Sequence, residues 1–97
     1  LSRETADGRI ENAYTLKLIN MAEDARDFEV AVSGLPGIEL LGAQRFAGDA
    51  GSIREVRVTV VAPPDAGKSG ASPIACSVEA AGDPASRVIE KSTFVLP

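Results

Sequence analysis

The amino-acid sequence predicts an all-β fold, an immunoglobulin-like β-sandwich of about seven antiparallel strands with no major helix. Apolar and polar residues alternate with a period of two in several short segments, which is the pattern of half-buried strands. Turn-forming residues separate these segments roughly every 8–12 residues, and no window carries a stripe at the helical period. A length of 97 residues fits one domain, so residues 1–97 are predicted to form a single fold.

Four segments alternate most clearly, and each is predicted to be a strand with one face in the core. The residues that share a face are Tyr14, Leu16 and Leu18 in 13–20; Phe28, Val30 and Val32 in 26–33; Arg54, Val56, Val58 and Val60 in 53–61; and Ile74, Cys76, Val78 and Ala80 in 73–80. Aromatic residues make up only 4% of the chain, so the core must consist mainly of aliphatic side chains. Among these, Val and Ile favour strands.

Two weaker segments complete the predicted sandwich. Residues 87–96 place Phe94 and Leu96 on one face, although the rest of that segment alternates less cleanly. Residues 38–46 are predicted to form one strand that bends at Gly42, because glycine in a strand marks a bend or bulge.

Turn chemistry adds further expectations. A short piece around Arg9 and Ile10 is a candidate for an additional edge strand. Residues 34–37, Gly-Leu-Pro-Gly, predict a tight turn because proline fixes φ and glycine supplies a positive φ. Asn12 and Asn20 are expected to bracket the second strand, where an amide side chain can bond to nearby backbone. Residues 63–73, rich in Gly, Ser, Pro and Ala, predict an exposed mobile loop.

Charge and hydropathy exclude several classes of partner. The net charge is −4, and no two Lys or Arg residues are adjacent, so nucleic acid and anionic membrane surfaces are not expected as partners. No apolar stretch approaches the ~18 residues of a membrane span, and the start does not resemble a signal peptide. Because the chain opens at Leu1 without a methionine, it is expected to be a fragment of a larger protein.

The residue inventory predicts no catalytic, cofactor-binding or metal-binding residues. There is no histidine, so nucleophilic triads lack their usual base, and the few aromatics are needed in the core rather than in a cleft. Gly67-Lys68-Ser69 resembles part of a phosphate-binding loop. However, the glycine required five residues earlier is Ala62, and a strand rather than a helix is expected to follow. A flexible hairpin loop is the predicted role.

Cysteine, methionine and the acidic residues complete the list of candidate ligands. Cys76 is expected to be a small buried hydrophobe, with metal capture or mixed-disulfide exchange as the alternative. Met21 is the only possible thioether partner for it. The acids Glu23, Asp24 and Asp49 are expected in unrelated turns as solvated residues, since their spacing does not match a calcium loop.

Three stretches together resemble a known family. They are residues 3–4 (Arg-Glu) with 7–21 (Asp-Gly-Arg-Ile-Glu-Asn-Ala-Tyr-Thr-Leu-Lys-Leu-Ile-Asn-Met), residues 32–37 (Val-Ser-Gly-Leu-Pro-Gly) and residues 91–97 (Lys-Ser-Thr-Phe-Val-Leu-Pro). In this order and spacing they resemble the C-terminal immunoglobulin-like domain of the FixG/CcoG family, accessory proteins of cbb-type cytochrome oxidases. The first stretch is the most specific of the three.

The resemblance implies a context that the residues alone do not supply. Members of this family resemble inner-membrane polyferredoxins, with membrane helices, cytoplasmic cysteine motifs for two four-iron clusters and this domain on the periplasmic side. The family is implicated in oxidase assembly, with copper reduction as its expected chemistry. No cluster motif is present here, so no cofactor is expected in this chain. The antibody pattern of Cys, Trp and Cys is also missing, so only the architecture is immunoglobulin-like.

These observations predict a non-enzymatic, periplasmic interaction or scaffolding domain, tethered by upstream transmembrane helices. Its expected partner is an oxidase subunit or a copper chaperone, bound through a sheet face or an edge strand. One alternative is direct, transient copper(I) binding by Cys76 or Met21. Another is a generic adhesion or carbohydrate-binding module, which would need a groove with exposed aromatics.

Overall fold

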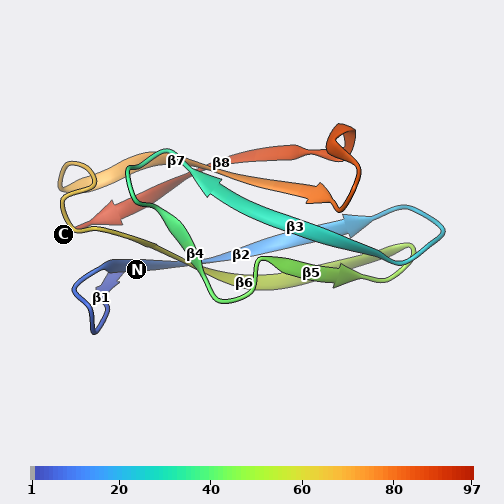
Figure 1. Ribbon diagram of the computed structural model, residues 1–97, viewed down its shortest axis with the longest axis horizontal. Helices are drawn as coiled ribbons and strands as arrows, with labels where there is room; N and C mark the ends of the chain where they lie inside the picture. Colours follow the sequence, from blue (N-terminus) through green and yellow to red (C-terminus); the bar gives the residue numbers. More distant parts are fainter. Residues whose placement is uncertain (1) are drawn as a thin grey trace.

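The computed structural model describes residues 2–97 and places antiparallel strands in two stacked sheets, with Cα extents of 44 × 23 × 18 Å (Figure 1). The strands are β1 (Ser2–Glu4), β2 (Ile10–Asn20), β3 (Arg26–Ser33), β4 (Glu39–Leu41), β5 (Arg45–Gly48), β6 (Ser52–Ala62), β7 (Gly70–Ala80) and β8 (Val88–Leu96). The one helical element among the described residues is the short 3₁₀ helix η1 (Pro84–Ser86). The prediction of no major helix is therefore confirmed.

The strand order identifies the sandwich as immunoglobulin-like. The first sheet has the order β1-β2-β6-β4, and the second has the order β5-β3-β7-β8. If the short edge strand β5 is set aside, the other seven strands reproduce the A-B-E-D and C-F-G sheets of a constant-type immunoglobulin domain. The predicted fold class is confirmed, and β5 makes the eighth strand.

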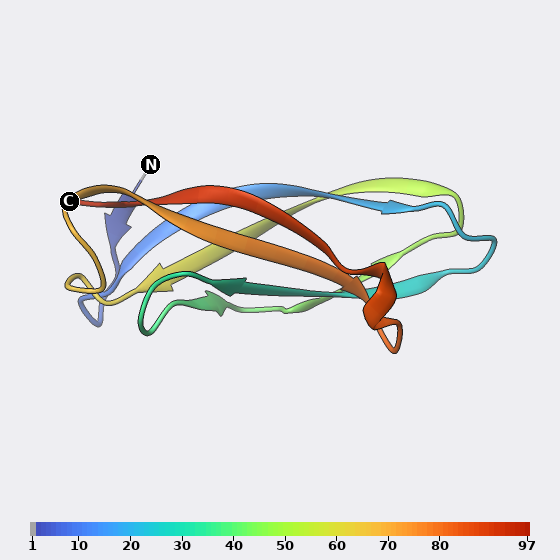
Figure 2. The ribbon, with the colours of Figure 1, turned by 90° about the horizontal axis from the view of Figure 1, so that it is seen from above.

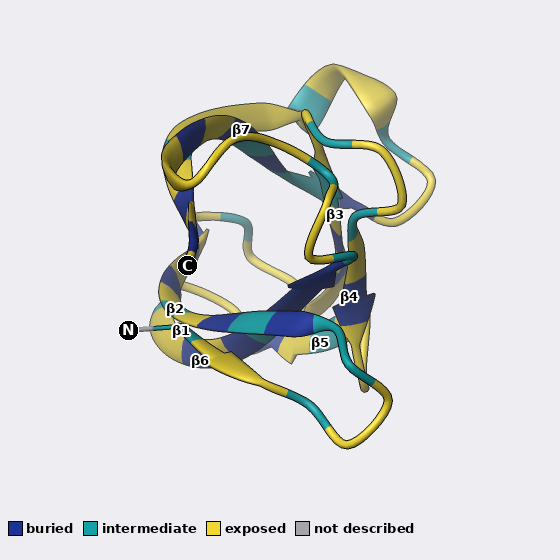
Figure 3. Cartoon of the chain, turned by 90° about the vertical axis from the view of Figure 1, so that its left-hand side faces the viewer, coloured by how far each residue is buried: buried dark blue, intermediate teal, exposed yellow. Residues whose placement is uncertain are grey.

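The alternating pattern fixes which side chains enter the core. β2 and β6 form an eleven-pair ladder from Ile10 opposite Ala62 to Asn20 opposite Ser52, and even-numbered residues of both strands face the second sheet. Buried and exposed residues accordingly alternate along the strands (Figure 3). Arg54 shares this parity but lies near the exposed end of the ladder, where its guanidinium donates to the Ala47 carbonyl at 2.7 Å.

The core lies between the sheets and is almost entirely aliphatic. Its members come from strands of both sheets, and the largest fully buried side chain is Phe94 of β8. The buried residues of this cluster are Ile10, Leu16, Leu18, Phe28, Val30, Leu40, Val56, Val58, Val60, Ala62, Ile74, Ala80, Phe94 and Leu96. The predicted core faces of 13–20, 26–33, 73–80 and 87–96 are therefore confirmed, with Tyr14, Val32 and Val78 packed at the border.

The segment 38–46 differs from its prediction. It is not one bent strand, because β4 pairs with β6 in the first sheet while β5 pairs with β3 in the second. The chain crosses between the sheets at Gly42, whose φ of +88° is open to glycine but strained for other residues. Short edge segments have no strong face preference of their own, so the sheet they join is decided by the strands beside them.

The N-terminal edge strand also differs from its prediction. The residues that pair with β2 are Ser2–Glu4, whereas Ile10 already belongs to β2 and Arg9 lies in the turn between them. The predicted loop 63–73 is shorter than expected, because β7 begins at Gly70. Pairing with β8 extends the strand into a sequence whose composition is typical of a loop.

The Gly-Leu-Pro-Gly turn is confirmed, and it shows why glycine is needed there. Gly34 has a φ of +124°, and a Cβ at this position would lie 2.9 Å from the Ile74 Cα and from the Pro73 carbonyl oxygen. Such a contact is closer than real Cβ atoms make. The β3–β4 turn therefore packs directly on the backbone of β7.

Candidate interaction site

The structure does not bring the candidate metal ligands together. Cys76 lies in the interior on β7 with 2% of its surface exposed, whereas Met21 follows β2 on the surface with 82% exposed. Within residues 2–97 no group of three or more His, Cys, Asp or Glu side chains is arranged to hold a metal ion. No observation on these residues favours the copper-binding alternative.

The phosphate-loop resemblance is also without structural support. Gly67, Lys68 and Ser69 are exposed in the β6–β7 connection, and β7 follows at once instead of a helix. A phosphate-binding loop needs the N-terminus of a helix behind it, and none follows here. The prediction of a hairpin loop is wrong, because β6 and β7 lie in different sheets and the connection crosses from one sheet to the other.

The acidic turns are closer to each other than the sequence suggested. The side-chain amide of Asn20 donates to the backbone carbonyls of Asp24, Gly48 and Asp49 at 3.0, 3.1 and 3.1 Å. The prediction of unrelated turns is therefore wrong, since Asn20 joins the β2–β3 turn to the β5–β6 turn. Its oxygen also accepts from the Ala22 amide at 3.0 Å, which confirms the expected strand-end role of this asparagine.

Asn12 does not end a strand, contrary to its prediction. It lies inside β2, is buried, and bonds to the opposite sheet: its amide donates to the Val95 carbonyl at 3.1 Å, and its oxygen accepts from the Val95 amide at 2.9 Å. Two residues along, the Tyr14 hydroxyl donates to the Thr93 carbonyl at 2.6 Å. These side chains bridge β2 and β8. They close the C-terminal half of the gap between the two strands, around Thr93 and Val95.

The same hydrogen bonds fix the direction of the backbone groups along β8. In an antiparallel ladder successive residues alternate between facing the partner strand and facing away from it. Because the Thr93 and Val95 groups face away from β7, those of Ile89 and Lys91 do so as well, since the β7–β8 register is continuous. Within residues 2–97 no strand pairs with β8 on that side. The C-terminal half of the β8 edge, at Thr93 and Val95, is thus covered by side chains of β2. The N-terminal half, at Ile89 and Lys91, presents free backbone groups.

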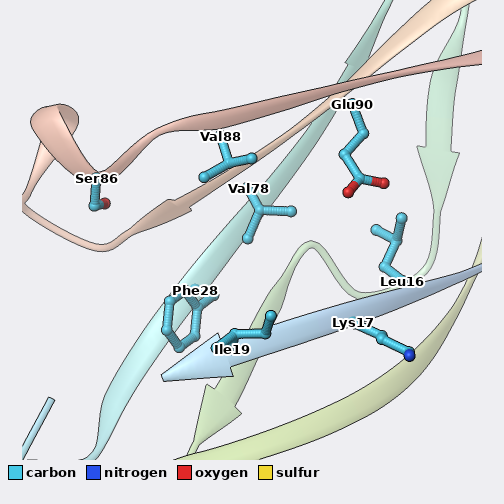
Figure 4. Close-up of a pocket in the computed structure, with 8 residues that line it drawn as sticks. All are labelled: Leu16, Lys17, Ile19, Phe28, Val78, Ser86, Val88 and Glu90. Carbon is cyan, nitrogen blue, oxygen red and sulfur yellow. The ribbon is translucent and has the colours of Figure 1, made fainter. Parts of the chain in front are cut away.

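Beside the uncovered half of β8, a groove opens between the two sheets (Figure 4). It has a volume of about 150 Å³, and its lining is mainly apolar. The lining residues are Leu16, Lys17 and Ile19 of β2, Phe28 of β3, Val78 of β7, Ser86 of η1, and Val88 and Glu90 of β8. In the close-up the Glu90 carboxylate points from β8 toward β2.

Exposed apolar side chains adjoin this groove. Ile19 on β2 is paired with Ile53 on β6, and Val88 and Ile89 begin β8; each of the four is more than half exposed. These residues lie at the end of the sandwich that carries the β2–β3 turn and η1, opposite to β1 and the end of β8 (Figures 1 and 2). Ile19 and Val88 line the groove, whereas Ile53 and Ile89 face away from the core on the outer surfaces of the two sheets.

Tyr14 gives the closed half of the β2–β8 side a pH dependence. Burial raises the pKa of Tyr14 to about 12, with a smaller contribution from nearby Cys76, against ~10 for an unfolded chain. Because the pKa of Tyr14 is higher in the folded chain, the protonated phenol stabilises the fold below pH ~10. This contribution to the free energy of unfolding is lost as the pH rises through the pKa of the folded chain. Since the chain has one tyrosine, ultraviolet titration of the phenolate reports on it directly.

We expect a phenolate midpoint near 12 that coincides with loss of tertiary structure. The Tyr14→Phe variant should lose about 1 kcal/mol of stability at neutral pH, because one hydrogen bond is removed. It should also lack the decline in stability that begins above pH ~10 in the parent chain. Ionisation at the ordinary pKa, with the circular dichroism of the folded chain unchanged, would contradict this assignment.

Cys76 is expected to be chemically inert in the folded chain. Burial raises the pKa of its thiol, so the nucleophilic thiolate is scarce and shielded. Alkylation then requires an opening that costs ~5 kcal/mol, which slows the reaction at least about 1,000-fold relative to denatured chain. Mass spectrometry of iodoacetamide-treated chain, with and without denaturant, measures this ratio. Similar rates in the two samples would show that the thiol is accessible.

Sequence reasoning missed the residues that define this side of the molecule. The cross-sheet role of Asn12 and the inward position of Glu90 depend on β2 and β8 being neighbours, which no local pattern reveals. The only signal for Glu90 was the imperfect alternation of 87–96, since an acid occupies an even position that Phe94 and Leu96 mark as inward.

The arrangement offers a sheet edge and a groove for binding, and residues 2–97 bring together no metal-ligand cluster. The molecule is an immunoglobulin-like sandwich domain. Comparison with protein families matches residues 1–97 to one family, described as "IG-like fold at C-terminal of FixG, putative oxidoreductase". The match covers the whole chain, so the chain belongs to the FixG C-terminal domain family, and the resemblance drawn from the sequence is confirmed.

Solved structures give the same fold. A FixG-related protein from Vibrio parahaemolyticus superposes with a TM-score of 0.79 at 22% identity, covering 99% of this chain and 91% of the other. An extracellular fragment of EsaA from Streptococcus gallolyticus gives a TM-score of 0.51 at 12% identity, covering 89% of this chain and 23% of that one. No curated protein matches the sequence. None of the helical segments among residues 2–97 has the length and hydrophobicity of a membrane span.

Proposed function

We propose that this domain is a non-catalytic interaction module on the periplasmic side of the bacterial inner membrane, within a FixG-like protein that serves cbb-type oxidase assembly and copper supply. It docks a subunit of the oxidase or a periplasmic copper carrier. The family match supports the parent protein as a FixG-type oxidoreductase. In this proposal the iron–sulfur clusters and the membrane helices belong to other parts of that protein.

The observation that carries the proposal is the uncovered half of β8 beside an apolar groove. Free backbone groups and exposed apolar side chains are the two features by which sheets bind other proteins. The groove is at the end of the sandwich opposite to β1 (Figure 1). A tether entering at β1 therefore leaves the groove free to meet a partner.

The test uses isotope-labelled 97-residue chain and measures backbone chemical shifts during titration with purified oxidase subunits and copper carriers. We expect saturable shifts with at least one of these proteins. In cells, deletion of the domain from the full-length protein should lower the amount of assembled oxidase while the membrane part still accumulates. If no partner binds and assembly is unchanged by the deletion, the proposal is wrong.

A further inference from the structure

The uncovered half of β8 is a template for one more strand. The amide and carbonyl groups of Ile89 and Lys91 face away from β7, as the side-chain bonds to Thr93 and Val95 establish for this parity. An added strand pairing with Ile89 and Lys91 would satisfy both N–H and both C=O groups. Its residues opposite Val88 and Glu90 would then face the groove, because directly opposite residues in a ladder share a face.

The groove limits what such a strand can carry opposite Val88. Its volume of about 150 Å³ is lined there by apolar side chains, among them Phe28 and Val78. A cavity of similar size with an apolar lining accommodates a benzene-sized group, so it has room for one aliphatic side chain. Burying one such side chain contributes favourable binding free energy without any polar cost.

Glu90 restricts which residue the added strand can place opposite it, two positions from the residue opposite Val88. Its side chain points into the groove, and within residues 2–97 its carboxylate forms no ion pair. Arg87 is already paired with Glu79 at 2.9 Å, and Lys91 lies on the other face of β8. Lys17 of β2 lines the same groove but forms no ion pair with Glu90. A strand that covers Glu90 is therefore favoured when it brings a cation of its own, because an unpaired buried carboxylate is costly.

Charge also opposes pairing with a second copy of this chain. Two β8 strands joined antiparallel through Ile89 and Lys91 would place Glu90 opposite Glu90 of the other copy. A register shifted by one pair in one direction places Lys91 opposite Lys91, and in the other direction it places Glu90 against Val88. Each arrangement puts like charges or an unpaired acid in the interface, so self-pairing is disfavoured.

We propose that the groove between β2 and β8 binds an extended segment of a partner protein as a new antiparallel strand on β8, with an aliphatic residue opposite Val88 and Lys or Arg opposite Glu90. The segment therefore contains the pattern basic–any–aliphatic, read from its N-terminus. This inference rests on the proposed function and specifies its surface and its ligand. The charge complementarity at Glu90 is the feature that selects a foreign segment over another copy.

Synthetic peptides test the pattern directly. Ser-Thr-Lys-Thr-Leu-Thr-Ser is the matching probe, and Ser-Thr-Glu-Thr-Leu-Thr-Ser is its charge-reversed control. Titrated into labelled chain, the lysine peptide should shift resonances of β8 and slow hydrogen exchange at the Ile89 and Lys91 amides. It should bind about ten-fold more tightly than the control, because the lysine peptide gains an ion pair with Glu90 where the control places two like charges opposite each other.

Variants of the chain provide the matched controls. Glu90→Lys should invert the preference between the two peptides, whereas Asp65→Lys, an equal charge change in the exposed β6–β7 loop, should leave it unchanged. Ile89→Pro removes the outward amide without breaking a bond to β7, and edge strands tolerate proline at such positions. It should keep the fold and lose peptide binding.

Three results would overturn the inference: equal affinity for the two peptides, shifts confined to another surface, or no binding of the lysine peptide. Concentration-dependent protection of Ile89 and Lys91 without peptide would overturn it in favour of self-association. The Ile89→Pro variant separates this failure from failure of the proposed function. If that variant still captures an oxidase subunit or copper carrier, the domain is an interaction module that uses another face.

Discussion

Replacing Phe94 by alanine is expected to lower the free energy of unfolding by about 4 kcal/mol. Phe94 is 0% exposed and is the largest fully buried side chain. Its neighbours in the core are mostly aliphatic residues on strands, whose backbone pairing prevents them from moving into the vacated space. The cost therefore includes both the lost burial and an unfilled cavity.

Urea denaturation measures the change, and Val95→Ala supplies the control. Val95 is the next residue on β8 but faces outward with 39% of its surface exposed, so its truncation should cost no more than about 1 kcal/mol. Domains of this size are commonly stable by 5–15 kcal/mol, so Phe94→Ala chain should fold but with a small margin. Comparable losses for the two variants would contradict the position of Phe94 in the core.

The strands could be predicted because alternation is a local consequence of burying one face. In 13–20, Leu16 and Leu18 had to share a side, and any register that exposed them would forfeit most of the core. The prediction failed where that constraint was weak. Residues 38–46 carry few apolar residues at regular spacing, so their division between β4 and β5 was decided by pairing with β6 and β3.

The interaction site could not be predicted because it is made by two strand edges far apart in sequence. Asn12 and Val95 are separated by 83 positions, yet their hydrogen bonds determine which part of β8 is closed. The sequence carried an indirect trace of this division. Alternation is clean at Phe94 and Leu96, where β8 borders the core, and breaks down at Glu90, where it borders the groove.

One strand therefore serves two purposes. The C-terminal half of β8 contributes Phe94 to the core and is sealed by Asn12 and Tyr14, which keeps its edge from pairing with other chains. The other half, beginning at Val88, has an open edge. There the inward Glu90 disfavours pairing with a second copy of the chain. Stability and binding are thus separated along the strand, so a substitution of the exposed Glu90 should change binding with little effect on folding.

Replacing Asn20 by alanine is expected to cost about 3 kcal/mol of stability, mainly because the hydrogen bonds of its side chain are lost. Asn20 is 3% exposed, and its two amide N–H groups are shared among three backbone carbonyls in and beside two different turns, while its oxygen accepts from the Ala22 amide. Alanine leaves these groups without their partner, and the bond to the Gly48 carbonyl is buried, where water does not readily replace it. Fewer hydrogen bonds then join the two turns, one of them the bond from the Gly51 amide to the Ala22 carbonyl at 3.1 Å.

Two further variants identify the donor as the important group. Asn20→Asp keeps an acceptor for the Ala22 amide but turns the donor toward the carbonyls into a second acceptor, so at neutral pH it should be at least as destabilising as alanine. Gln44→Ala removes an exposed amide and should change the free energy of unfolding by less than about 0.5 kcal/mol. Hydrogen exchange should locate the loosened region in the β2–β3 and β5–β6 turns. If Asn20→Asp retained full stability, the three carbonyl bonds would not be what holds these turns together.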